Sequence, residues 1–405
     1  MTLNPAVNKG PAVMPVAETR RRAGRLRRFD WILPGAAFAL SVYGAVLVWS
    51  ATRGRTGLTG GDPQFFLKRH LMNLGIGLVL MALTSVLSYA WVRACAPVYY
   101  VLALLGLLVV LTPVGTTING AHSWIVLGGG FSIQPAEFAK VAVVLGLAVV
   151  LTLKPAKGIM SEHVAEAVPP RRLAAATVVA CIPTSIIMLL PDLGSAMVIL
   201  VATAGVLVFA GTSAKWLALL SVGAAVAAVA AAQLHLLAQH QVNRFAAFAD
   251  PHLDPRGVGY NTAQARLAIG SGGLLGKGLF NGPHTNGRYV PEQQTDFVFT
   301  VAGEELGFVG SVTLIALFGV VLLRGIAIAR RCDDLFGMLV CAGVVSWFAF
   351  ETFENIGMTL GIMPVAGIPL PFVSYGGSSM FAGFIAIGLV ENVRLRSTRP
   401  AVTPR

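Results

Sequence analysis

Charged residues are scarce in this sequence, and their scarcity excludes most classes of soluble protein. Only 12% of the 405 residues are Asp, Glu, Lys or Arg, whereas a soluble domain carries about 25%. The chain is also 55% hydrophobic, with a mean hydropathy of +0.74. We therefore interpret it as a polytopic membrane protein and not as a globular enzyme with an anchor.

Cysteine and histidine are too few and too scattered to form the usual metal sites. The four cysteines show no CxxC or zinc spacing, and none falls in a segment that we expect on the extracellular side, so no disulfide is expected. The seven histidines include no HExxH motif. We predict no metal site and no required cofactor, although a divalent cation could assist at a phosphate.

Signals for nucleic-acid and nucleotide binding are also missing. The net charge of +12 comes from basic residues that lie between apolar runs and not on one soluble face, which argues against a nucleic-acid partner. The segment 271–278 (SGGLLGKG) fails as a P-loop, because Ser271 replaces the first Gly and Gly278 replaces the Ser or Thr. We interpret this segment as a flexible Gly-rich turn.

The sequence does contain a series of apolar runs that can cross a bilayer, for which about 20 residues are needed. We predict an all-α polytopic membrane protein with about ten transmembrane helices and one long extracellular loop, residues 239–297, between helices 7 and 8. The membrane domain covers residues 31–394, between a basic tail (1–30) and a short tail (395–405). The predicted spans are 32–50, 69–88, 94–113, 135–153, 172–190, 193–211, 215–238, 298–323, 335–360 and 372–391.

The distribution of Lys and Arg sets the expected orientation. With the N-terminus inside, 20 of the 30 basic residues fall on the inner side, where positive charge gathers. Both termini are therefore predicted to be cytoplasmic, and loop 239–297 to lie outside. Because nucleotide sugars are cytoplasmic, chemistry on the outer face requires a substrate already delivered there, most simply a lipid-linked one.

Ionisable side chains recur where the predicted helices meet the outer face, and in a membrane such residues mark functional sites by default. Asp296 lies where a polar segment gives way to the apolar run that begins at Phe297. Glu137 and Lys140 are i,i+3 neighbours on a helix that Pro135 opens, so they can form an ion pair. A structural ion pair or a solvated loop end is the alternative interpretation.

Two further segments add polar groups at the same face. The long loop contains Pro, Asp and Gly at spacings that specify turns, and its basic residues could hold pyrophosphate oxygens. The segment 369–379 is interrupted by Pro and Gly at the start of the last span, where non-helical backbone needs a cavity or protein cover. The alternatives are solvated loop charges and a helix entry with small residues for close packing.

Four stretches together resemble the SEDS (shape, elongation, division and sporulation) proteins, which are polytopic peptidoglycan glycosyltransferases. The resemblance spans about residues 30–394. Its last motif is more similar to the RodA branch, which builds lateral wall during cell elongation, than to the FtsW branch, which builds the septum. The four stretches are INGAHSWIVLGGGFSIQPAEFAK (118–140), PDLGSA (191–196), residues 241–310 and GIMPVAGIPLPFVSYGGSSM (361–380).

The resemblance implies a lipid II polymerase in the bacterial cytoplasmic membrane that makes β-1,4 glycan strands, linked to undecaprenyl pyrophosphate, on the outer face. It implies a class B penicillin-binding protein as a partner that crosslinks these strands. It also implies that Asp296 is the catalytic residue, and we assign it as the general base. Gln294 stands where many members have His. The implied substrate-binding residues are Trp124, Gln134, Glu137, Lys140, Arg244, Lys277, Glu292, Ser374, Tyr375 and Ser378.

Two alternative functions stay open at this point. A lipid II flippase would share the cavity and the substrate, but it would need no base and would need access from both faces. An acidic residue at the outer boundary, with no matching acidic group inside, favours the polymerase. Within the family, a septal FtsW-type polymerase is the other alternative.

Overall fold

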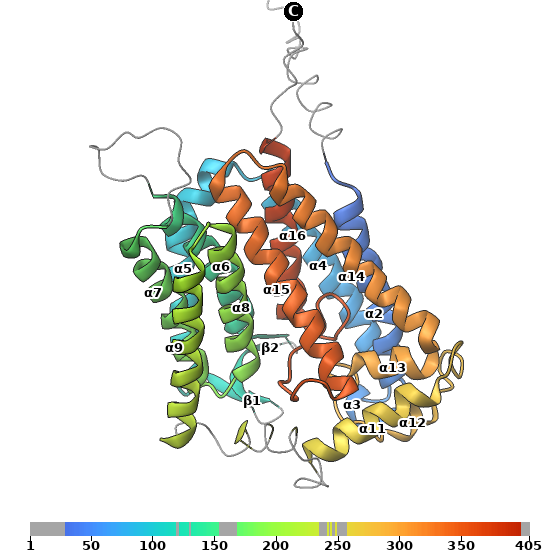
Figure 1. The fold of residues 1–405 in the computed structure, drawn as a ribbon. Coiled ribbons are helices and arrows are strands. Elements are labelled where there is room, and N and C mark those ends of the chain that lie inside the picture. The colour runs from blue at the N-terminus through green and yellow to red at the C-terminus, as the bar shows by residue number, and fades with distance from the viewer. Residues whose placement is uncertain are drawn as a thin grey trace, which may run out of the picture.

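The computed structural model describes residues 29–118, 121–128, 131–153, 168–234, 241–242, 244, 248 and 257–397. In this part of the chain, long helices stand side by side, and a small sheet and several short helices gather at one end of the bundle (Figure 1). Nearly all of the predicted basic tail, most of the short C-terminal tail, and loop residues 249–256 lie outside the described residues.

Nine of the ten predicted spans each correspond to one apolar helix, and the eighth is divided between two, which confirms the helix-rich polytopic fold. Among the described residues, nine helices are long and apolar enough to cross a membrane, and α8, with 17 residues, is a shorter apolar helix beside them. These helices are α2 (Ile32–Thr52), α4 (Phe65–Val86), α5 (Tyr89–Val110), α6 (Pro135–Thr152), α7 (Pro170–Leu189), α8 (Leu193–Phe209), α9 (Ala214–Gln233), α14 (Gly307–Arg330), α15 (Leu335–Leu360) and α16 (Gly377–Ser397).

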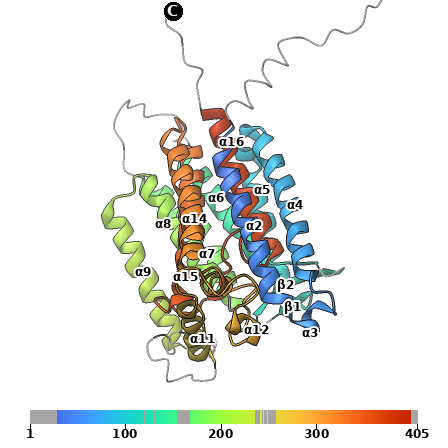
Figure 2. The same ribbon diagram turned by 90° about the vertical axis from the view of Figure 1, so that its right-hand side faces the viewer.

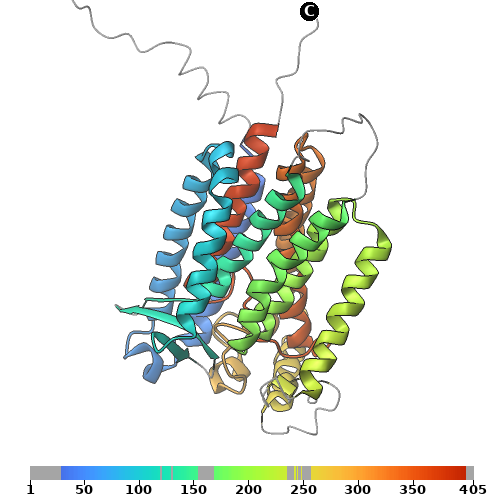
Figure 3. The same ribbon diagram turned by 90° about the vertical axis from the view of Figure 1, so that its left-hand side faces the viewer.

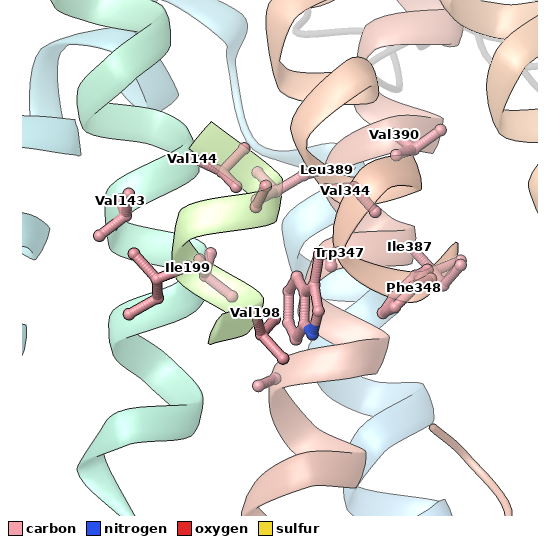
Figure 4. Close-up of a cluster of buried hydrophobic side chains, with 14 of the residues drawn as sticks. Val143, Val144, Val198, Ile199, Val344, Trp347, Phe348, Ile387, Leu389 and Val390 are labelled. Carbon is pink, nitrogen blue, oxygen red and sulfur yellow. The ribbon is translucent and has the colours of Figure 1, made fainter. Parts of the chain in front are cut away.

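The apolar core lies where α6, α8, α15 and α16 meet. Val144, Ile199, Trp347, Phe348 and Ile387 come from these four helices and are at most 2% exposed (Figure 4). By contrast, α9 contains no buried residue and stands at the edge of the bundle (Figure 3). The central helices α6 and α15 are therefore the ones that can hold charged groups away from lipid.

A three-stranded antiparallel sheet, which the sequence did not predict, lies between α5 and α6. It contains β1 (Gly115–Ile118), β2 (Ala121–Gly128) and β3 (Phe131–Ile133), in the order β1-β2-β3. Short helices α3 (Thr56–Thr59), α11 (Val258–Ser271) and α12 (Pro283–Gly287) lie at the same end, away from the C-terminal end of α16 (Figure 2). The described parts of the segments predicted to be extracellular thus gather at one end of the bundle.

The eighth predicted span is divided into two helices, α13 (Val298–Glu305) and α14. The break falls at Gly307, whose φ of +66° would be strained in any residue with a Cβ. Segment 273–278, which we call the clasp, pairs with the broken turn through four backbone hydrogen bonds of 2.9–3.1 Å. The donors are the N–H groups of Lys277, Gly278, Phe308 and Val309, and the acceptors are the carbonyl oxygens of Glu304, Glu305, Gly273 and Leu274.

The clasp replaces hydrogen bonds that a continuous helix would have made, and unpaired backbone groups are costly at membrane depth. The Gly-rich turn that we predicted to be flexible is therefore docked against the helix break. The buried carboxylates beside it are bound as well. Glu304 accepts from the N–H groups of His284 and Thr285 at 2.7 and 2.8 Å, and Glu305 accepts from the Ser50 hydroxyl at 2.7 Å.

Candidate active site

Asp296 stands in a tight turn directly before α13. The N–H groups of residues 295–297 all donate to the carbonyl oxygen of Glu292 at 3.1–3.2 Å. Glu292 has a φ of +49°, which is uncommon for a residue with a Cβ and is typical of functional sites. On α15, the amide of Asn355 donates to the carbonyl oxygen of Asp296 at 2.8 Å. The turn and α15 together fix the position of the aspartate.

The irregular segment 364–376 forms the neighbouring wall. The hydroxyl of Ser374 donates to the carbonyl oxygen of Thr295, and the N–H of Tyr375 donates to the carbonyl oxygen of Gln294 at 2.8 Å. Because these residues bond across to the Asp296 turn, the last helix begins at Gly377 and not at residue 372 as predicted.

Gly367 lies between Asp296 and Arg244. Its φ is +73°, and a Cβ at this position would lie 3.5 Å from Asp296 Oδ2 and 3.8 Å from both terminal nitrogens of Arg244. Arg244 Nη1 also donates to the carbonyl oxygen of Ala366 at 3.2 Å. The catalytic candidate and a fixed guanidinium thus face the same small space.

These segments surround a cavity of about 360 Å³ at the sheet end of the bundle. Its polar side chains come from the sheet, the starts of α6 and α8, the long loop, the turn before α13 and the segment before α16. They belong to Ser123, Trp124, Gln134, Glu137, Asp192, Ser195, Arg244, Asn261, Glu292, Thr295, Asp296, Tyr375 and Ser379.

One wall is a buried charge cluster on α6 and α15. Lys140 Nζ donates to Glu137 Oε1 at 2.8 Å and to Glu351 Oε1, and it lies 5.1 Å from the centre of the Trp347 ring. All three charged side chains are at most 2% exposed. Glu137 lines the cavity, whereas Lys140 lies behind it. The predicted pair is therefore a triad, whose third member, Glu351, the sequence did not reveal.

Asp192 is a second acidic residue of the cavity that had no predicted role, although its PDLGSA motif was noted. Its carboxylate caps α8 by accepting from the Ser195 N–H at 3.0 Å, and it also accepts from the Gln134 amide at 3.0 Å. It thereby connects the starts of α6 and α8.

The surroundings of Asp296 make its carboxylate more basic than usual. Burial, and next the negative charge of Glu292, raise the pKa of Asp296 to about 6, while Arg244 and a hydrogen bond from Thr295 act in the opposite direction. Asp296 does not cap α13, because Phe297 occupies that position. Burial therefore has the largest effect on its pKa.

Most of the predicted site residues line this one cavity: Asp296, Trp124, Gln134, Glu137, Arg244, Glu292 and Tyr375. The others do not. Lys140 supports Glu137 from behind, Ser374 and Ser378 bond to backbone groups, and Lys277 is exposed on the clasp. Within the described ranges, no group of three or more His, Cys, Asp or Glu side chains is placed to hold a metal ion.

Comparison with known proteins gives matches over nearly the whole chain. Residues 30–399 match the family model of the cell cycle proteins FtsW, RodA and SpoVE. Stage V sporulation protein E of Bacillus subtilis is 37% identical over 369 residues, which are 90% of this chain and 96% of the relative. Peptidoglycan glycosyltransferase MrdB of Escherichia coli K12 is 35% identical over 361 residues, 88% and 90% of the two chains. A probable peptidoglycan glycosyltransferase FtsW of Trichlorobacter lovleyi is 33% identical over 381 residues, 93% and 96% of the two chains.

Solved structures share the fold as well. The rod shape determining protein RodA of Thermus thermophilus is 31% identical, with a TM-score of 0.65 over 92% of this chain and 98% of that one. A chain from a peptidoglycan synthase complex, described as coordinating polymerization and crosslinking, is 33% identical, with a TM-score of 0.73 over 90% and 97% of the two chains.

Proposed function

Because this chain belongs to the family of the cell cycle proteins FtsW, RodA and SpoVE, we propose that its cavity joins lipid-linked disaccharides into glycan strands, with Asp296 as the general base. Relatives of nearly the same length are named peptidoglycan glycosyltransferases, and peptidoglycan glycosyltransfer is the reaction of this enzyme. We assign lipid II as its substrate.

The observation that carries the mechanism is the position of Asp296 opposite Arg244, across Gly367. The 4-hydroxyl of the acceptor sugar attacks the anomeric carbon of the donor while its proton passes to the Asp296 carboxylate. A base with a pKa near the working pH suits this step, and a pKa of about 6 meets that condition. The bond from the anomeric carbon to the pyrophosphate oxygen breaks in the same displacement, which inverts the α-linked donor to a β-1,4 product.

Arg244 is the group we assign to the leaving pyrophosphate. Its guanidinium is fixed by the Ala366 carbonyl oxygen and keeps further N–H donors for phosphate oxygens. A fixed positive charge stabilises the negative charge that develops on the leaving group without needing to reorganise. We assign Trp124, Gln134 and Glu137, which also line the cavity, to contacts with the sugars.

A flippase fits the described structure less well than a polymerase. A carrier must open at both ends of the bundle, but the cavity lies at the sheet end. At the other end, Asp30 accepts from Arg324 Nε at 3.0 Å and also pairs with Arg394, which ties α14 and α16 to the residues just before α2. Purified protein supplied with lipid II in detergent separates the two functions, because only a polymerase lengthens glycan strands.

The location of the cavity on the outer face of the cytoplasmic membrane, with both termini inside, is part of the proposal. It rests on the distribution of Lys and Arg and on the position of α11, α12 and the sheet at one end of the bundle. A cysteine introduced at the exposed residue Asn286 should react with a membrane-impermeant maleimide on intact cells, and one at Ala156 should not. The reverse labelling pattern would contradict the orientation.

A transpeptidase partner and a role in elongation are also proposals. The solved synthase complex is described as coordinating polymerization with crosslinking, so a class B penicillin-binding protein is the partner that we expect. The segment 361–380 favours the RodA branch over the FtsW branch. Depletion of the protein should give round cells if it builds lateral wall, and filaments if it builds the septum.

A further inference from the structure

A second cavity, of about 530 Å³, lies on the flank of the bundle between α2 and α14, which pack side by side (Figure 1). We call it the α2–α14 groove. Tyr43 is its one lining residue with a polar side-chain atom, and that hydroxyl donates to the carbonyl oxygen of Gly310 at 3.0 Å, so the groove surface is hydrocarbon. The lining residues are Phe38, Ala39, Val42, Tyr43, Val46, Leu279, Leu306 and Leu317.

Positive charge lies at one end of this groove. Residues 38, 42, 46, 49 and 53 follow at intervals of three or four, so they share one face of α2, and Arg53 stands at the end nearest the sheet. Arg53 packs over the Phe280 ring at 4.4 Å and donates to the Phe280 carbonyl oxygen at 2.8 Å, while a guanidinium has five N–H donors in all. Lys277 is exposed, two residues before the groove residue Leu279.

We propose that the α2–α14 groove binds one chain of an anionic phospholipid, whose phosphate lies at Arg53 and Lys277. The apolar groove along the helix would bind the acyl chain, and the cations at its outer end would bind the anionic head group. Basic sites between transmembrane helices bind anionic lipid head groups in this way. Phe38 and Val42 are 45% and 40% exposed, so a chain can enter directly from the bilayer.

The position of the groove distinguishes its occupant from the reacting substrate. Leu306, which lines the groove, follows α13, whereas Asp296 precedes α13. The eight residues of α13 span about 12 Å, and the bond between Glu305 and Ser50 lies beside this end of α13. A lipid in the groove therefore contacts the break between α13 and α14 but does not reach the catalytic cavity.

Lipid retention by the purified full-length chain tests the inference without relying on catalysis. Protein in mild detergent is mixed with phosphatidylglycerol, phosphatidylethanolamine or a polyprenyl diphosphate, and adducts are counted by native mass spectrometry. Wild type should retain one phosphatidylglycerol at least several-fold better than phosphatidylethanolamine. Val42→Trp fills the groove and should reduce retention about tenfold, whereas Val79→Trp, on a 60% exposed position of α4, should not.

A second pair of variants tests the head-group end. Lys277→Gln should remove most of the preference for phosphatidylglycerol, and Lys68→Gln, a loss of an exposed cation on α4, should leave it intact. The inference is wrong if wild type retains both phospholipids equally, or if Val42→Trp retains phosphatidylglycerol like wild type. Displacement by an equal concentration of the polyprenyl diphosphate would assign the groove to the substrate chain instead. Photocrosslinking of a partner helix from Val42 in membranes would assign it to a protein.

Discussion

Asp296→Asn should make the protein inactive and, at neutral pH, more stable. The amide keeps the shape of the carboxylate but cannot accept a proton from the acceptor hydroxyl, so polymerisation of lipid II should fall by at least about 100-fold. The gain in stability arises because Asp296 is ionised at neutral pH in surroundings that disfavour its charge.

The size of the gain follows from the pKa. A rise from 3.8 to about 6 corresponds to about 3 kcal/mol at about 1.36 kcal/mol per unit. Solvent screening of this partly exposed side chain reduces the figure, so we expect about 1–3 kcal/mol. The pKa of Asp296 is higher in the folded state than in the unfolded state. The destabilisation caused by its charge is therefore complete above pH 6 and disappears as the pH falls to 3.8.

Thermal unfolding in detergent measures this difference. At pH 7.5 the Tm of Asp296→Asn should exceed that of wild type by at least about 2 °C, and the difference should shrink as the pH is lowered to 4.5. As a control, Asp192→Ala should lower the Tm at both pH values, because it removes the cap of α8, which contributes about 1 kcal/mol. An Asn variant that polymerises lipid II normally, or that is less stable than wild type at pH 7.5, would refute the reasoning.

Three further changes test the surroundings of the site. Glu292→Gln removes a negative charge that raises the pKa of Asp296. The acid limb of a profile of kcat/KM against pH, expected near pH 6 in wild type, should therefore move to lower pH. An unchanged acid limb would contradict this. Gly367→Ala forces a φ of +73° at a cost of about 1–2 kcal/mol and places a methyl group beside Asp296, so both the Tm and the polymerisation rate should fall. Lys140→Met leaves two buried carboxylates without a positive partner and should lower the free energy of unfolding by about 3–5 kcal/mol. The double variant Lys140→Met with Glu351→Gln should regain part of this loss, measured as a Tm above that of Lys140→Met alone.

Hydropathy and residue order were sufficient to predict the spans and the place of Asp296. Long apolar runs have few alternatives to crossing the bilayer, so nine of the ten predicted spans each correspond to one helix of the structure, and only the eighth is divided. The change from a polar to an apolar segment at Phe297 marks a helix start, and Asp296 lies within one residue of it. These features depend only on residues that are close together in the sequence, so they can be predicted from the sequence alone.

Partners from distant parts of the chain were not predictable in the same way. Glu351 lies in an apolar run, and only the packing of α15 on α6 makes it the second carboxylate on Lys140. The clasp could not be inferred because its role depends on the break at Gly307. From the sequence alone, segment 273–278 is an ordinary turn and the residues around Gly307 belong to an ordinary helix. Lys277 shows the same limitation, since the family resemblance placed it at the cavity, whereas the clasp holds its backbone elsewhere.

The break between α13 and α14 has a consequence for how the protein is made. Helices α14 and α15 are each long enough to enter the bilayer, and the short connection 331–334 lets them insert as a hairpin. With eight residues, α13 is too short to cross by itself, and its last carbonyl groups find donors in the clasp, which is synthesised earlier. We therefore expect the membrane scaffold to form during translocation and the Asp296 turn to close onto it afterwards, so that catalytic competence is the last property the nascent chain acquires.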